Sequence, residues 1–154
     1  MTALTWRRWQ PSDRVAVADL HDRALAGFSV ILQRGSDAPD LHDVEAAYLR
    51  PGGEFLVGEI AGAVVAMGAL KRIDAATGEI KRMRIDPAHQ RRGHGRALVE
   101  RLLDAARERG LRTVVLDTTS EQVGARRLYE SMGFAATGTR TVGPFTVIDY
   151  RLDL

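Results

Sequence analysis

The sequence predicts an α/β fold in which a mixed, twisted sheet is flanked by helices. Two observations carry this prediction. The chain has 154 residues, the length of one ordinary domain over 1–154. Segments with the two-residue period of a strand alternate along it with segments that have the period of a helix, and one short turn joins two expected strands directly as a hairpin.

The first expected elements are a strand and a helix. Thr5 to Gln10 predict the strand. Pro11-Ser-Asp13 is typical of a helix entry, and the apolar residues from Arg14 to Leu25 recur with the helical period. From Gly27 to Pro39 neither period is visible, so no element is predicted there.

A second short helix is expected from Asp40 to Leu49, and Pro51-Gly52-Gly53 would end it. Two apolar segments follow, Phe55 to Ile60 and Val64 to Leu70. They flank Ala61-Gly62-Ala63, a turn sequence that predicts an antiparallel hairpin.

The next strand, from Glu79 to Ile85, cannot be regular. Ile80 would lie on one face of it, whereas Met83 and the final isoleucine would lie on the other, so strict alternation cannot bury all three. A β-bulge at Lys81 or Arg82 would correct the phase. Such a bulge would also splay the strand from its next neighbour and leave backbone groups free for an extended, amide-bearing ligand.

The remaining elements follow without interruption. A helix with an apolar stripe is predicted from Arg96 to Arg109, with Gly110 as its cap. Thr113 to Asp117 predict a buried strand, Gln122 to Met132 a helix, and Phe145 to Leu154 a final strand. The sequence has no internal repeat and no low-complexity linker, which favours a single domain.

Composition excludes several classes of site. Cysteine is absent, so disulfides, thiolate metal sites and a cysteine acyl intermediate are excluded. The 4 histidines are scattered and no metal site is expected. A net charge of +2 does not predict a nucleic-acid partner. No apolar run reaches the length of a membrane span and the chain start lacks a signal-peptide core, which favours a cytoplasmic protein with no membrane partner.

The turn from Arg91 to Arg96 has the composition of a phosphate-binding loop. Gly93 and Gly95 allow the backbone to approach a ligand closely. The first amides of the helix that follows have no partners within the helix, so an anion can accept from them. Arg91, Arg92 and Arg96 add positive charge around the same amides.

Two motifs identify the kind of ligand. A P-loop would require Gly-Lys-Ser or Gly-Lys-Thr, and a dinucleotide loop would have a third small residue where this chain has Leu98. Gln90-x-x-Gly93-x-Gly95, after a strand that begins at Glu79, resembles the coenzyme A loop of the GCN5-related N-acetyltransferase (GNAT) superfamily. Further on, Ala125-Arg-Arg-Leu-Tyr-Glu-Ser-Met-Gly-Phe134 resembles the next motif of that superfamily.

The resemblance implies acetyl-CoA as co-substrate. Its pyrophosphate would lie on the amides of the loop, and its pantetheine arm would lie along the splayed strand. Gln122 stands where the superfamily often has an asparagine that helps to hold the cofactor. The cofactor-binding residues implied in this way are Met83, Arg84, Ile85, Arg91, Arg92, Gly93, His94, Gly95, Arg96 and Gln122.

The resemblance also implies two catalytic residues, on opposite sides of the thioester. An acceptor ammonium with an ordinary pKa of about 10 must lose a proton before it attacks, and the departing thiolate is helped by receiving one. Glu79 is expected to act as the general base, through a water. Tyr129 is expected to act as the general acid toward sulfur, or as the hydrogen-bond donor that orients it.

The favoured activity is direct acetyl transfer to a primary amine in a ternary complex. Two other classes stay open. A dinucleotide-binding domain would use Asp117, at the end of a strand, as its ribose-binding acid. A non-catalytic acyl-CoA-binding or regulatory module would keep the loop without turnover, although the presence of both Glu79 and Tyr129 weighs against it.

The acceptor is not specified. In the resembled fold its pocket is formed by the first two helices and the final hairpin, here 19–48 and 139–149. Asp37, Asp40, Asp43 and Glu45 make the second-helix region acidic, which suits a cationic amine or equally a solvated helix face. Small amines, amino acids, antibiotics and protein termini all stay open as acceptors, and a monomer and a homodimer are both open as the oligomeric state.

Overall fold

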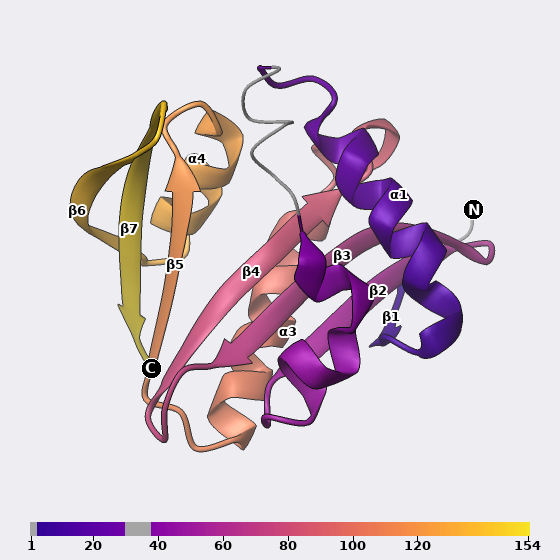
Figure 1. Ribbon diagram of the computed structural model, residues 1–154, viewed down its shortest axis with the longest axis horizontal. Coiled ribbons are helices and arrows are strands. Elements are labelled where there is room, and N and C mark those ends of the chain that lie inside the picture. The colour runs from indigo at the N-terminus through magenta and orange to yellow at the C-terminus, as the bar shows by residue number, and fades with distance from the viewer. Residues whose placement is uncertain (1–2, 30–37) are drawn as a thin grey trace.

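The computed structural model describes residues 3–29 and 38–154. They form one mixed, seven-stranded sheet in the order β1-β2-β3-β4-β5-β7-β6 (Figure 1). Every neighbouring pair is antiparallel except β4 and β5. The strands are β1 (Thr5–Arg8), β2 (Glu54–Ile60), β3 (Ala63–Arg72), β4 (Thr77–Ile85), β5 (Thr113–Thr119), β6 (Ala135–Val142) and β7 (Phe145–Asp153).

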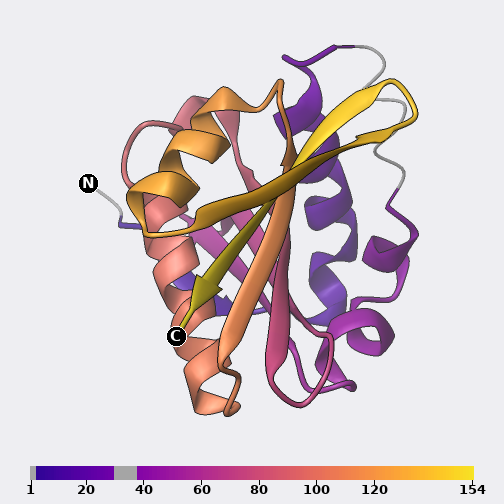
Figure 2. The same cartoon turned by 90° about the vertical axis from the view of Figure 1, so that its left-hand side faces the viewer.

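Helices cover both faces of the sheet (Figure 2). One face carries α1 (Arg14–Leu25) with the short turns η2 (Pro39–His42) and η3 (Glu45–Leu49), and a core that includes Val17, Leu20 and Met67. The opposite face carries α3 (His94–Glu108) and α4 (Val123–Ser131), and a second core. That core includes Leu98, Leu102, Ile80, Tyr129 and Tyr150.

Most predicted elements are confirmed within one or two residues, and α1 has the expected bounds. The predicted helix from Asp40 to Leu49 is wrong. Asp43, with φ −146° and ψ 72°, is not helical and divides the segment into a 3-10 turn and a single π turn. None of the helices in the described residues is long and apolar enough to cross a bilayer.

The predicted bulge in β4 is confirmed. Ala69 on β3 pairs with Lys81, but Met67 pairs with Arg84, so two residues of β4 lie opposite one residue of β3. Arg82, at the bulge, has a left-handed φ of 58°. The extra residue brings Met83 onto the same core as Ile80, and leaves Arg84 on the face that carries α1.

The predicted splay between β4 and β5 is confirmed as well. The two strands pair only from Thr77 with Thr113 to Glu79 with Val115. Beyond Glu79 they diverge toward the upper end of the molecule in Figure 1. The second half of β4 therefore has β3 on one edge and an opening on the other.

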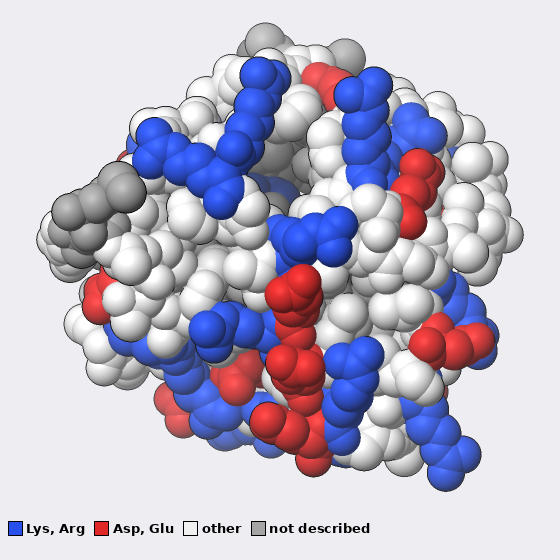
Figure 3. Space-filling model, turned by 180° about the vertical axis from the view of Figure 1, so that it is seen from behind, with Lys and Arg blue, Asp and Glu red and all other residues white. Residues whose placement is uncertain are grey.

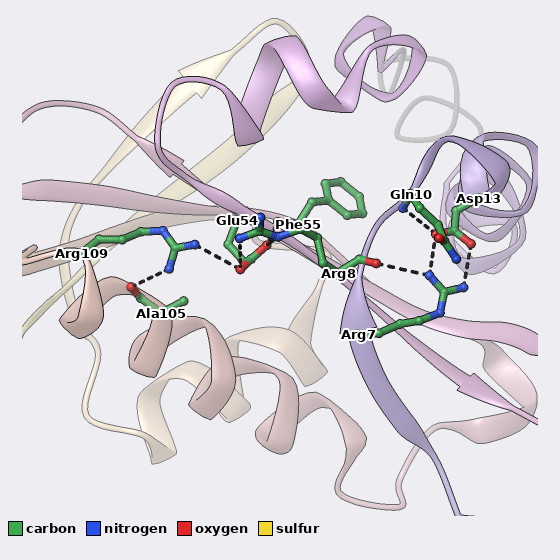
Figure 4. Close-up of polar contacts among 8 residues, drawn as sticks. All are labelled: Arg7, Arg8, Gln10, Asp13, Glu54, Phe55, Ala105 and Arg109. Atoms are coloured by element: carbon green, nitrogen blue, oxygen red, sulfur yellow. Dashed lines mark hydrogen bonds and ion pairs between the residues drawn. The ribbon is translucent and has the colours of Figure 1, made fainter.

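Far from this opening, the buried carboxylate of Glu54 joins three elements (Figure 4). Arg8 of β1 donates from Nε to Oε1 of Glu54 at 2.8 Å, and Arg109 at the end of α3 donates from Nη2 to Oε2 at 3.1 Å. The amide of Phe55 also donates to Oε1, at 3.0 Å. Because the carboxylate is desolvated, its partners stabilise the fold more than a surface ion pair would.

Glu54→Gln is expected to lower the free energy of unfolding by ~2 kcal/mol, because two guanidinium groups lose their shared anion while the shape is kept. Denaturant unfolding measures this change. The matched control is Asp153→Asn, which removes an exposed partner of Arg151 and should change stability by less than about 0.5 kcal/mol. Equal changes for the two variants would contradict a structural role for Glu54.

Candidate active site

A cavity of about 170 Å³ lies in the opening between β4 and β5. Its walls come from both strands, from α4 and from β7, so it exists only because the sheet splays at this point. The lining residues are Ile80, Lys81, Arg82, Met83, Arg84, Asp117, Thr118, Thr119, Gln122, Ala125, Tyr129 and Val147.

Tyr129 of α4 supplies the wall on the α3 side. Its hydroxyl lies 3.7 Å from the sulfur of Met83, and its ring packs edge-on against Phe134 at a centroid distance of 5.9 Å. Burial raises the pKa of the Tyr129 phenol to about 12, although the nearby Arg84 cation opposes this rise. The phenol is therefore protonated at neutral pH and can donate a hydrogen bond into the cavity.

Arg82 points from the bulge toward the α1 side, where it is neutralised. It donates to the carboxylate of Asp40 from Nε at 3.0 Å and from Nη2 at 2.8 Å, and the hydroxyl of Tyr48 donates to the same carboxylate. Burial opposes ionisation of Asp40, but these bonds outweigh it and hold the pKa of the carboxyl below its ordinary value. Asp40 therefore cannot supply a free negative charge to an acceptor amine.

Arg84 lies on the same side as Arg82 but is paired differently. Its Nε donates to Nδ1 of His21 in α1 at 3.3 Å, and its Nη1 donates to the carbonyl of Met83 at 2.8 Å. Burial, with repulsion from Arg82, lowers the pKa of the Arg84 guanidinium to about 10. It is nevertheless charged at neutral pH.

Glu79 sits at the start of the opening, next to the cavity but not among its lining residues. Burial raises the pKa of its carboxyl, and the negative charge of Asp117 adds to the rise, while Lys81 and Lys71 oppose it. Asp117 itself is held by Nη2 of Arg140 at 2.7 Å. Glu79 is thus a half-buried carboxylate with more affinity for a proton than an exposed glutamate has.

The loop before α3 has the backbone of an anion-binding turn. Gln90 donates from its side-chain amide to the carbonyl of Ile85 at 3.1 Å, which fastens the loop to the end of β4. Arg91 and Gly93 have left-handed φ values of 63° and 82°. The helix then begins at His94, and the amides of its first turn have no carbonyl within the helix to donate to.

The surroundings of this loop carry positive charge. Arg91 and Arg92 are exposed, and the pKa of His94 is lowered by burial and by electrostatic repulsion from its neighbours, Arg92 among them. Seen from the side of α3, a hollow opens near the top of the molecule with lysine and arginine side chains gathered around it (Figure 3). An anionic ligand would be attracted to this side.

Two residues of the loop motif differ from the expectation. Gly95 is helical and has an ordinary φ, and a Cβ there would lie 3.1 Å from Leu128, so this glycine permits close packing of α3 on α4. Arg96 was expected to add charge around the loop amides, but its Nη2 donates to the hydroxyl of Ser131 at 2.9 Å.

Gln122 lines the cavity just before α4. Its Oε1 accepts from the hydroxyls of Thr118 and Thr119 at 2.9 and 3.2 Å and from the amide of Thr119 at 3.3 Å. These threonines therefore bond to Gln122 and do not cap the helix. The Nε2 group of Gln122 donates no hydrogen bond within the described chain, so it is the part of the side chain that is left for a ligand.

A model of the acetyltransferase (GNAT) family matches residues 17–134, which include the loop, the splayed strands and α4. The chain belongs to the GNAT family. It is 38% identical over 101 residues to N-acetylaspartate synthetase of Danio rerio, a match over 64% of this chain and 36% of that protein. It is also 38% identical over 105 residues to human N-acetyltransferase 8, covering 64% of this chain and 46% of that one. The GNAT chain thus spans less than half of these relatives.

Solved GNAT structures share the whole fold. The yncA protein of Salmonella typhimurium, whose structure includes its cofactor acetyl-CoA, is 26% identical and superposes with a TM-score of 0.81, over 99% of this chain and 94% of that one. The dinucleotide-binding alternative is wrong, because it requires a parallel doubly wound sheet and β4–β5 is the one parallel pair among the described strands. Within residues 3–29 and 38–154, no three His, Asp or Glu side chains are grouped closely enough to hold a metal ion.

The GNAT fold gathers some predicted site residues and separates others. Tyr129, Met83, Arg84 and Gln122 meet around the cavity, Glu79 lies at its edge, and Ile85 with the loop 91–96 lies beyond its far end. Sequence reasoning missed that Lys81, Arg82 and three residues of β5 also line it. The bulge expected at Lys81 or Arg82 was the signal for the first two, since a bulge redirects side chains beside a site.

Proposed function

We propose that this GNAT chain transfers the acetyl group of acetyl-CoA directly to a primary amine. The observation that carries the proposal is the cavity between β4 and β5, which has the phenol of Tyr129 in its wall and a half-buried carboxylate, Glu79, at its edge. Family membership and a structural relative that holds acetyl-CoA support the same function.

The residues present fit acetyl-CoA. The amides of the first turn of α3, beside the exposed Arg91 and Arg92, would hold its pyrophosphate. Its pantetheine arm would occupy the edge of β4 that β5 leaves unpaired, and Nε2 of Gln122 would donate to it. When bound, acetyl-CoA supplies the thioester whose carbonyl carbon the amine attacks.

Two side chains would manage the protons. Glu79 accepts a proton from the acceptor ammonium, directly or through a water, and its raised pKa makes it a better base than an exposed glutamate. Tyr129 donates from its hydroxyl toward the sulfur as the carbon–sulfur bond breaks. With a pKa of about 12, against about 8.5 for an ordinary thiol, the phenol stabilises the thiolate mainly as a hydrogen-bond donor.

The proposed activity is tested by incubating the chain with acetyl-CoA and a panel of primary amines. Release of free thiol measures turnover, and intact-mass analysis of the acceptor identifies a product heavier by one acetyl group. Thiol release without an acetylated acceptor would indicate hydrolysis and would contradict amine transfer. Acetyl-CoA binding with neither reaction would favour the non-catalytic binding module.

Gly93→Val is expected to weaken acetyl-CoA binding by an order of magnitude or more. Gly93 has a φ of 82°, which a β-branched residue cannot adopt without strain, so the loop amides would be redirected. Isothermal titration with acetyl-CoA measures the affinity.

Gly110→Val is the matched control for this loop. Gly110 also has a left-handed φ, 73°, with nothing within 4 Å of an added Cβ, but it lies at the other end of α3. It should cost comparable stability and leave acetyl-CoA affinity unchanged. If both variants keep full affinity, the loop is not the pyrophosphate site.

A further inference from the structure

Arg84 is a partly buried cation that has no carboxylate among its hydrogen-bond partners in the described residues. Its Nε and Nη1 donate to an imidazole nitrogen and to a backbone carbonyl, and its Nη2 donates to no residue that the structure describes. No carboxylate in the described residues forms an ion pair with it. Desolvation of a guanidinium that lacks a counter-ion is costly. Here burial, together with repulsion from Arg82, lowers the guanidinium pKa to about 10.

The other charges around the cavity leave an excess of positive charge. Arg82 is neutralised by Asp40, and Asp117, the one acid among the described residues that line the cavity, is held by Arg140. Lys81 also lines the cavity and forms no ion pair with the described part of the chain. An anionic group that entered beside Arg84 would therefore meet two cations, and no unpaired acid among the described residues of the wall.

We propose that the acceptor of this chain is an amine that carries a carboxylate, and that the guanidinium of Arg84 binds this carboxylate. The inference rests on the proposed acetyltransferase function and names its substrate class. It replaces the expectation, drawn from Asp40 and its acidic neighbours, of an acceptor that is only cationic, since Asp40 is bound to Arg82 and Tyr48. Asp37, another of those acids, lies outside the described residues.

The side chain of Arg84 suits the acceptor and not the thioester end of the cofactor, so only its backbone would serve the cofactor-binding role that the family resemblance implies. The alternation of β4, with its bulge, puts Arg84 and Glu79 on the face that carries α1, while Met83 and Tyr129 lie on the face that carries α3. An amino acid on the α1 side could place its amine toward the Glu79 carboxylate and its carboxylate toward Arg84. An arginine fork fits a carboxylate better than any other side chain does.

The wild-type chain provides the first test, by comparison of amino acids with their carboxamides at saturating acetyl-CoA. The panel includes α-, β- and γ-amino acids, so that the spacing between amine and carboxylate is not assumed. We expect kcat/KM for the best acid to exceed that for its carboxamide by about 10-fold or more. The amine of a carboxamide has the lower pKa, so acid–base chemistry alone would favour the carboxamide.

Arg84→Gln provides the second test. It should remove most of the preference for the acid by raising its KM about 10-fold or more, and leave the Kd for acetyl-CoA within about 2-fold. Arg84→Lys, which keeps the charge but not the fork, should recover part of the preference. The control is Arg107→Gln, an exposed arginine of α3 paired with Asp104, which should change neither quantity.

The outcomes separate this inference from the proposed function. Equal turnover of acids and carboxamides by the wild type would overturn the inference and leave the acetyltransferase intact. A loss of acetyl-CoA affinity in Arg84→Gln, with unchanged preference, would assign Arg84 to the cofactor and overturn it too. If acetyl-CoA binds but no amine in the panel is acetylated, both the proposed function and the inference fail. The wild-type comparison holds even if Arg84→Gln does not fold.

Discussion

Tyr129→Phe is expected to lower kcat by roughly 10- to 10⁴-fold while the Kd for acetyl-CoA stays nearly unchanged. The hydroxyl lies in the cavity wall and its pKa of about 12 keeps it protonated, so its hydrogen bond strengthens as negative charge develops on the sulfur. Initial rates with the best acceptor, coenzyme A titrations and thermal melts on one preparation measure the three quantities.

Tyr150→Phe is the control for a buried tyrosine hydroxyl that does not face the cavity. The Tyr150 ring lies 6.3 Å from that of Tyr129, and its hydroxyl donates to Oε1 of Glu130 at 2.8 Å. Its loss should lower stability and leave kcat close to the parental value. A Tyr129→Phe chain with parental kcat would make Tyr129 a packing residue, and the thiolate would then leave unaided or take its proton from water.

Glu79→Gln is expected to give the second large effect, a fall in kcat of roughly 10²-fold or more near neutral pH with partial recovery at alkaline pH. The substitution keeps the shape and removes the base. Recovery follows because the acceptor loses its proton unaided as the pH approaches the pKa of its own ammonium. Rates measured across the pH range for parent and variant test this, and superimposable profiles would leave Glu79 with a structural role only.

The pKa of Glu79 also sets the sign of the pH dependence. A base must be deprotonated to act, so activity should rise with pH through the Glu79 pKa, which burial places above its ordinary value of 4.5. Asp117→Asn removes a negative charge that raises this pKa, so it should move the rising limb to lower pH. A shift to higher pH would contradict the assignment of the limb to Glu79.

Local patterns in the sequence were sufficient for much of the fold. The helix from Arg14 to Leu25, the hairpin around Gly62 and the bulge near Arg82 were all predictable, because each depends on residues close together in the chain. The prediction that failed is the helix from Asp40 to Leu49. The composition of this segment favours a helix, but the non-helical conformation of Asp43 separates a 3-10 turn from a π turn.

In the candidate site, too, some features were predictable from local sequence and others depend on contacts between distant residues. The contiguous motifs of the sequence, through their resemblance to the GNAT superfamily, predicted the loop at Gly93 and the two side chains expected to move protons, and the phase of Ile80 and Met83 predicted the splayed strand. Only the tertiary structure decided that Asp40 is bound to Arg82, that Gly95 packs closely against Leu128, and that Arg84 faces the cavity without a counter-ion among the described residues. Each of these depends on side chains tens of residues apart, and whether a charge is neutralised is a property of the folded neighbourhood that no local period encodes.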